Sequence, residues 1–181
     1  MNHEKHQNLS CNFGSYVGAS RAAVSGATTI TAAPGDLNPT FGIGGLIYPP
    51  SGSQTPYSKG VGIVVQPDQK ILVSGPHFNN SNGEYGLLLS RYLPNGNLDA
   101  TFGVGGGVFQ GNGGGGGNLA LQSDGRILVF SGFQGTSILR YETNGTLDTT
   151  FDGDGVLPFS VFSAYAVQND SKIIVAGTKN Y

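Results

Sequence analysis

The chain has 181 residues, of which 31 are Gly, and charged residues make up only 11% of it. Its 9 basic and 11 acidic side chains give a net charge of −2, and no Lys/Arg cluster is present, which argues against nucleic acid or a membrane surface as partner. No apolar run approaches the ~20 residues that span a bilayer, and one cysteine gives no internal disulfide framework. Abundant Gly beside Tyr, Phe, Val and Ile predicts short strands joined by tight turns.

Residues 1–34 precede the first repeated motif and have no continuous apolar run of the kind found in a secretory signal. The stretch "ATTITA" has strand character. We expect it either to donate an edge strand to another copy or to form an extra strand of its own chain's first sheet. His3, His6 and Cys11 could ligate a metal, but no fourth ligand is near, which favours a tail segment.

One phrase recurs three times: "DLNPTFG" at residues 36–42, "NLDATFG" at 97–103 and "TLDTTFD" at 146–152. A second motif follows each phrase, as "QPDQKILVSG", "QSDGRILVFSG" and "QNDSKIIVAG". Asp-Gly between apolar runs predicts a two-residue hairpin turn with positive φ at both positions. The predicted turns are centred on Asp68, Asp124 and Asp170, and Asn95-Gly96 and Asn144-Gly145 predict a second hairpin in the same repeat. Each repeat therefore reads as four short strands in an antiparallel meander.

The strands "KILVSG", "RILVF" and "KIIVAG" are apolar on consecutive residues, which predicts burial on both faces. Stacked four-stranded sheets of this kind are the blades of a β-propeller. The predicted fold is all-β, with an incomplete ring of two full units (residues 35–97 and 98–146) and a partial one (residues 147–181). Because closed propellers take about four to eight blades, we expect the remainder of a longer propeller, several copies that complete the structure together, or an open array.

The recurring side chains have structural interpretations. We expect Phe41, Phe102 and Phe151 to fill the space between neighbouring blades, and Asp99 and Asp148 to accept backbone N–H bonds. One Arg-Tyr pair occurs in each full unit, as Arg91-Tyr92 and Arg140-Tyr141. The arginines could bind an acidic ligand, but recurrence favours scaffolding pairs with Asp99 and Asp148.

These motifs, together with "SRYLPNG" and "LRYETNG", resemble the delta-60 repeat, over about residues 35–181. The resemblance implies a propeller-like fold and a bacterial surface or secreted setting, and it carries no enzyme activity. Asn38-Pro39 in the first phrase and Asp152 and Asp154 after the third depart from the family pattern.

Asp148, Asp152 and Asp154 form a weak calcium candidate, with spaced carboxylates among glycines but no following bidentate Glu. A tight Asp/Gly turn is the favoured interpretation. The glycine run at residues 111–118 lacks the Lys-Ser/Thr of a phosphate loop and reads as a connection between blades. His77 reads as a surface residue, and no nucleophile, base and acid form an evident set.

We therefore expect a non-catalytic repeat scaffold, extracellular or at the cell surface, that self-associates or binds protein, without a cofactor. The alternative is a carbohydrate- or ligand-binding propeller whose site lies in loops such as "NNSNGEY". A propeller enzyme is the third and least favoured interpretation.

Overall fold

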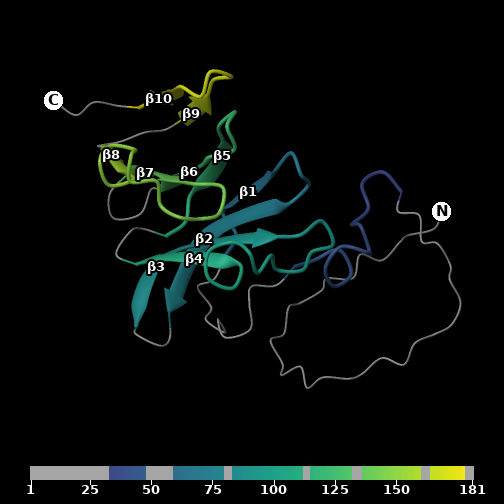
Figure 1. The fold of residues 1–181 in the computed structure, drawn as a ribbon. Coiled ribbons are helices and arrows are strands. Elements are labelled where there is room, and N and C mark those ends of the chain that lie inside the picture. Colours follow the sequence, from purple (N-terminus) through teal and green to yellow (C-terminus); the bar gives the residue numbers. More distant parts are fainter. Residues whose placement is uncertain are drawn as a thin grey trace, which may run out of the picture. The chain divides into compact units, whose positions relative to one another are not determined.

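The structure is a computed structural model that describes residues 33–47, 59–79, 83–111, 115–131, 136–159 and 164–177. His3, His6, Cys11 and the "ATTITA" segment lie outside these residues, so their interpretations stay predictions. The described part of the chain contains no helix that is long and apolar enough to cross a membrane. Its regular structure consists of ten strands (Figure 1): β1 (Gly62–Val65), β2 (Ile71–Asn79), β3 (Glu84–Tyr92), β4 (Gly107–Gly111), β5 (Asn118–Leu121), β6 (Ile127–Ser131), β7 (Thr136–Tyr141), β8 (Val156–Phe159), β9 (Ala164–Val167) and β10 (Ile173–Ala176).

The strands form three antiparallel sheets, each a meander in chain order. Sheet 1 is β1-β2-β3-β4, sheet 2 is β5-β6-β7-β8, and sheet 3 is the hairpin β9-β10. The predicted four-stranded meander is thus confirmed for two sheets. The sheets are offset from the phrases, because residues 97–103 join β3 to β4 and residues 146–152 join β7 to β8.

The hairpin turns correct one prediction. Positive φ occurs at the second central residue, Gln69, Gly125 or Ser171, and not at the Asp that precedes it. In the first turn the N–H of Gln69 donates to the Gln66 carbonyl at 2.9 Å, and the N–H of Gln66 donates to the Lys70 carbonyl at 2.7 Å. This pattern is a type I turn followed by a left-handed residue, the three-residue hairpin loop. The Asp is the third residue of the type I turn, a position that takes negative φ. Its carboxylate accepts the N–H two residues later, as at Asp124 and Arg126 (3.0 Å).

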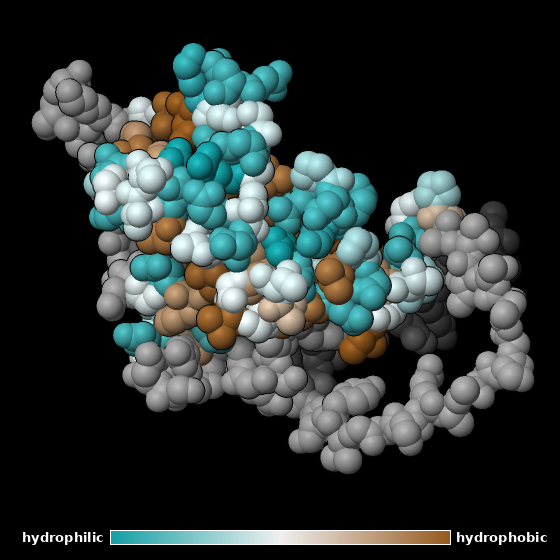
Figure 2. Space-filling view, viewed as in Figure 1, coloured by the Kyte–Doolittle hydropathy of each residue, from teal (hydrophilic) through white to brown (hydrophobic). Residues whose placement is uncertain are grey.

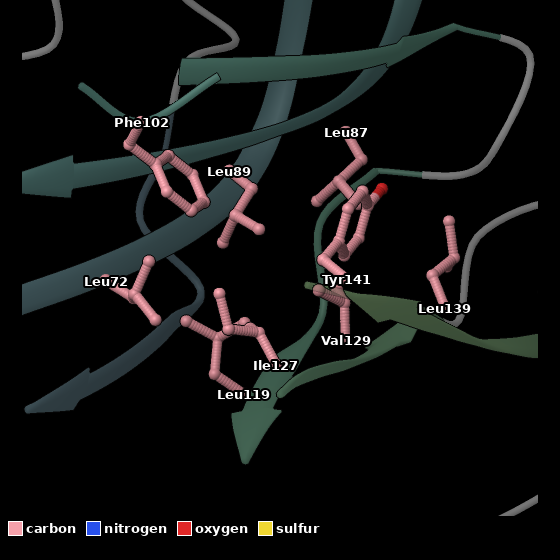
Figure 3. Packing of buried hydrophobic residues seen from close by; sticks show 9 residues of the cluster. All are labelled: Leu72, Leu87, Leu89, Phe102, Leu119, Ile127, Val129, Leu139 and Tyr141. Carbon is pink, nitrogen blue, oxygen red and sulfur yellow. The ribbon is translucent and has the colours of Figure 1, made fainter. Parts of the chain in front are cut away.

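Sheets 1 and 2 bury one apolar cluster between them. Figure 3 shows side chains of the two sheets pointing toward one another. The side that each sheet turns toward the following sheet is called its rear face, and the opposite side its front face. The cluster joins the rear face of sheet 1 to the front face of sheet 2, through Leu72, Leu87, Leu89 and Phe102 on one side and Leu119, Ile127, Val129, Leu139 and Tyr141 on the other.

A second cluster repeats this arrangement between sheets 2 and 3. Leu128, Phe130 and Ile138 on the rear of sheet 2 pack against the front of sheet 3. Phe130 and Tyr165 stack with ring centroids 3.6 Å apart. All five residues of β6 are buried, which confirms the prediction of a strand covered on both faces. In β10, Ile173 and Val175 join the cluster, whereas Ile174 is exposed, so the prediction fails for that strand.

The glycine-rich connection between sheets is tightly packed where the structure describes it. A Cβ atom on Gly116 would overlap the backbone of Gly75 in β2, and one on Gly117 would overlap the carbonyl of Phe130 in β6. The hydroxyl of Ser74 donates a hydrogen bond to the Gly117 carbonyl. Glycine at these positions therefore permits the two sheets to approach each other backbone to backbone.

We predict that Gly116→Ala lowers the free energy of unfolding by about 1–3 kcal/mol, because the added methyl group forces the sheets apart. Gly60→Ala is the matched control, since its added Cβ would meet only Val73 Cγ1 at 3.5 Å, an ordinary contact. Urea unfolding followed by circular dichroism measures both variants. Equal stability of Gly116→Ala and the wild type would show that the close approach does not occur.

Candidate functional site

The most elaborate polar arrangement lies at the edge of the interface between sheets 1 and 2. Arg91, the second-last residue of β3, is buried and points from the rear face. Its Nε donates to Asp99 Oδ2 at 2.8 Å, and its guanidinium lies over the Phe102 ring at 4.6 Å. Its Nη1 donates to the Thr143 carbonyl of the next sheet's turn at 2.7 Å. One arginine thus links its own phrase to the following repeat.

The carboxylate of Asp99 also accepts hydrogen bonds from Thr101. Asp99 Oδ1 accepts the N–H of Thr101 at 3.1 Å and its hydroxyl at 2.6 Å. This is an Asx turn, which fixes the phrase as it leaves the strand. The backbone bond that sequence reasoning expected at Asp99 is therefore accompanied by a hydroxyl bond that it did not anticipate.

Sheet 2 repeats the arrangement with equivalent residues. Arg140 Nε donates to Asp148 Oδ2 at 2.7 Å, and Asp148 Oδ1 accepts the N–H and hydroxyl of Thr150 at 3.0 and 2.6 Å. Arg140 also lies over Phe151, at 4.5 Å from the ring centroid. The recurring Arg, Asp, Thr and Phe therefore act together, and we call each set a phrase cluster.

A second cation enters each phrase cluster from the first hairpin. Lys70 Nζ lies 3.3 Å from Asp99 Oδ2, and Arg126 Nε lies 3.1 Å from Asp148 Oδ2. Sequence reasoning missed both residues. The available signal was a basic residue that ends each Gln-x-Asp turn, at Lys70, Arg126 and Lys172.

These contacts determine the charge state of the buried carboxylates. Burial on its own would raise the pKa of Asp99. The Thr101 hydroxyl and N–H and the neighbouring Lys70 and Arg91 together lower that pKa well below its ordinary value. The pKa of Asp148 is lowered chiefly by the Thr150 hydroxyl. Both carboxylates are therefore charged partners of their arginines at neutral pH.

Each phrase docks on the turn of the following sheet through its backbone. The N–H of Gly42 donates to the Asn95 carbonyl, and that of Gly103 donates to the Asn144 carbonyl, both at 2.9 Å. Residues 36–42 therefore sit on sheet 1 as residues 97–103 sit on sheet 2. Asp152 holds a φ of 52°, close to the 55° of Gly42 and Gly103, so the third phrase keeps the docking conformation.

The first phrase differs from the others in charge. Asn38 replaces the Asp, and the position 61 residues before Arg91 is Ile30 (98 − 37 = 61, 91 − 61 = 30). Asn38 Oδ1 still accepts the N–H and hydroxyl of Thr40, at 3.1 and 2.7 Å. The Asx turn is thus retained, whereas both charges of the ion pair are replaced together.

The recurring phenylalanines and tyrosines lie in different parts of the sheet interfaces. Phe102 is fully buried between sheets 1 and 2, next to Gly145, and Phe151 packs on the cluster shared with sheet 3. Phe41 is half-buried. Tyr92 and Tyr141 are buried on the front faces, and burial raises the pKa of each.

The weak calcium candidate over Asp148, Asp152 and Asp154 stays a prediction. In the structure Asp148 accepts hydrogen bonds from Arg140 and Thr150, and Asp154 Oδ1 accepts the N–H of Val156 at 2.9 Å. Within the described residues, no group of three or more His, Cys, Asp or Glu side chains is placed to hold a metal ion. The spacing reflects turn formation, the interpretation favoured from sequence.

A shallow groove of about 350 Å³ lies on the front face of sheet 1. Its walls are largely aliphatic and include Ile47, Val61, Ile63, Val73 and Leu88. His77, predicted as a surface residue, is half-buried on the same sheet, and its ring meets the edge of Phe109 with centroids 5.7 Å apart. Desolvation by burial lowers the pKa of His77, so its ring is neutral at pH 7.

We predict that Asp99→Asn lowers the free energy of unfolding by about 3 kcal/mol, because the amide preserves the Asx turn but leaves the buried Arg91 without its counter-ion. Adding Arg91→Ile should then recover at least about 1 kcal/mol, since the uncompensated charge is removed. This pair of changes reproduces the Ile30 and Asn38 combination of the first repeat. Denaturant unfolding of the four proteins in the cycle measures the coupling, and strictly additive effects would contradict it.

Comparison with known proteins finds a family match over the two segments that contain the phrase clusters. The family model described as "Domain of unknown function (DUF5122) beta-propeller" matches residues 66–102 and 122–151. Each match begins at the Gln of the hairpin turn and ends at the Phe of the phrase, so it contains one whole phrase cluster. No curated protein and no solved structure gives a significant match. The chain is thus similar to an uncharacterised propeller-type repeat, and its fold is all-β, with propeller-like blades and no closed ring among the described residues.

Proposed function

We propose that this protein is a non-catalytic β-propeller repeat scaffold whose function is self-assembly or protein interaction. The observation that carries the proposal is the pair of uncovered apolar sheet faces. Ile63 on the front of sheet 1 is 70% exposed, and Ile174 on the rear of sheet 3 is 49% exposed. The equivalent positions inside the stack are buried, so these faces are built for contact and not for solvent.

The phrase clusters support a structural role for the recurring charged residues. Arg91 and Arg140 are both engaged by carboxylates and ring faces, and Arg91 also binds the next repeat. A guanidinium that is already paired in this way offers few donors to a ligand. The proposal therefore assigns these arginines to joining blades and not to recognition of an acidic ligand.

The proposal also covers the repeat family and the location of the protein. The motif order and spacing support membership of the delta-60 repeat family, and that resemblance supports a location outside the cell or on its surface. Immunodetection in intact and permeabilised cells of the source organism tests the location. Labelling only after permeabilisation would overturn it.

The groove on sheet 1 favours a second candidate, a ligand-binding module. Its aliphatic walls suit an apolar occupant better than a glycan, whose hydroxyl groups need polar partners. Figure 2 shows that apolar residues lie exposed among polar ones on the face in view. An exposed apolar surface therefore does not by itself identify the groove as a binding site. We therefore place this candidate second.

We predict that the 181-residue chain self-associates reversibly at micromolar concentrations, because exposed apolar faces of this kind favour burial. Light scattering coupled to size-exclusion chromatography measures the mass over a range of loading concentrations. A mass that stays at one chain at every concentration would contradict self-association and would favour the binding of a different partner.

A further inference from the structure

The two uncovered faces correspond to the two sides of interfaces that the chain already contains. Ile63, Ile71 and Val73 on the front of sheet 1 are the counterparts of Leu119, Ile127 and Val129, which bury against sheet 1 (offset 122 − 66 = 56). Ile174 on the rear of sheet 3 is the counterpart of Leu72 (offset 168 − 66 = 102). Leu72 and its sheet 2 equivalent Leu128 are both fully buried. A front face therefore suits a rear face, and one of each is open.

The groove on sheet 1 lies where a first and second strand of a preceding blade belong. Residues 33–47 already occupy the phrase position beside it, since Gly42 binds Asn95 as Gly103 binds Asn144. In sheets 1 and 2 the equivalent phrase joins the third strand to the fourth. The described segment therefore corresponds to the phrase of a preceding blade, and Ile47 forms one wall of the groove beside it.

Sheet 3 has the two strands that fit this position. The hairpin β9-β10 is equivalent to β1-β2 and β5-β6, the first two strands of the other sheets. Its front face is packed on sheet 2. Its rear face presents small side chains around one larger one, namely Ala164, Ala166, Ala176 and Ile174, all of them exposed. A flat face with a single projecting Ile can enter a shallow aliphatic groove without leaving a polar group unpaired.

We propose that β9-β10 of one copy docks in the groove on sheet 1 of a second copy, beside residues 33–47, with the rear of sheet 3 against the front of sheet 1. The contact is heterologous, because a rear face meets a front face. The inference rests on the proposed self-assembly and specifies the surfaces that carry it.

A second contact follows from the same register. Asp152 takes the place of Gly103, and residues 34–35 take the place of Asn95-Gly96, with Gly35 at a φ of 98° beside 84° for Gly96. In the proposed contact, the N–H of Asp152 would donate to the Pro34 carbonyl of the second copy. The left-handed conformation of Asp152 suits this role, since it reproduces the docking geometry of the other phrases.

The test uses Ile63→Glu and Ile174→Glu in the full 181-residue chain, each of which places a charge in the proposed junction. We expect the wild type to have a mass above that of one chain and each variant to weaken the dissociation constant by at least about tenfold. Val104→Glu is the control, because Val104 is 92% exposed on a turn that belongs to neither face. Circular dichroism verifies that all variants fold.

Mixing the two variants tests the direction of the contact. One junction then joins an unaltered front face to an unaltered rear face, so the mixture should recover two-chain particles that neither variant forms alone. A face that pairs with its own kind would give no such recovery. Association that survives Ile63→Glu or Ile174→Glu would overturn this inference while leaving self-assembly intact. A wild type that remains a single chain would overturn both.

Discussion

Each sheet of this chain is apolar on both faces, so no sheet is stable in water by itself. Strand β6 is covered on both sides and all of its residues are buried. Face-to-face stacking is the arrangement that removes both surfaces from water, and each added sheet covers one face and presents another. Among the described residues, the first and last sheets of the stack each have one exposed apolar face, which is the physical basis of the proposed assembly.

Stacking of apolar faces alone would not fix how one sheet lies on the next, because apolar contacts are not directional. The hydrogen bonds and ion pairs of the phrase clusters are directional and fix the position of one sheet on the next. Arg91 binds Asp99 in its own repeat and the Thr143 carbonyl in the following one, so a shift between sheets would break the hydrogen bond from the buried guanidinium to that carbonyl. The hydrogen bond from Gly103 to Asn144 adds a backbone constraint at the same edge. Sheets 2 and 3 are joined similarly, through Gln122 Nε2 and the Ser171 carbonyl at 2.6 Å.

Sequence reasoning predicted the meander, the turn positions and the two-sided burial of β6, because these depend on local turn chemistry and on periodicity. It misassigned the turn type, because an Asp-Gly pair fits both the two-residue hairpin loop and the three-residue loop that is observed. It favoured a turn over a weak calcium site for Asp148, Asp152 and Asp154, but spacing alone does not show that Arg140 donates to the first carboxylate. Lys70 lies 29 residues before Asp99 in the sequence, so only the sheet register brings the two together. The packing of Gly116 on Gly75 likewise depends on how two sheets meet.

The central claim is that the front of sheet 1 and the rear of sheet 3 are faces of one interface. Amide hydrogen exchange of the wild-type chain, followed by mass spectrometry at low and high protein concentration, tests it most directly. The account predicts that exchange slows with concentration in β1 and β10 together and stays unchanged in β6, which is already covered. Concentration-independent exchange in β1 and β10, or slowing in one of them without the other, would contradict it.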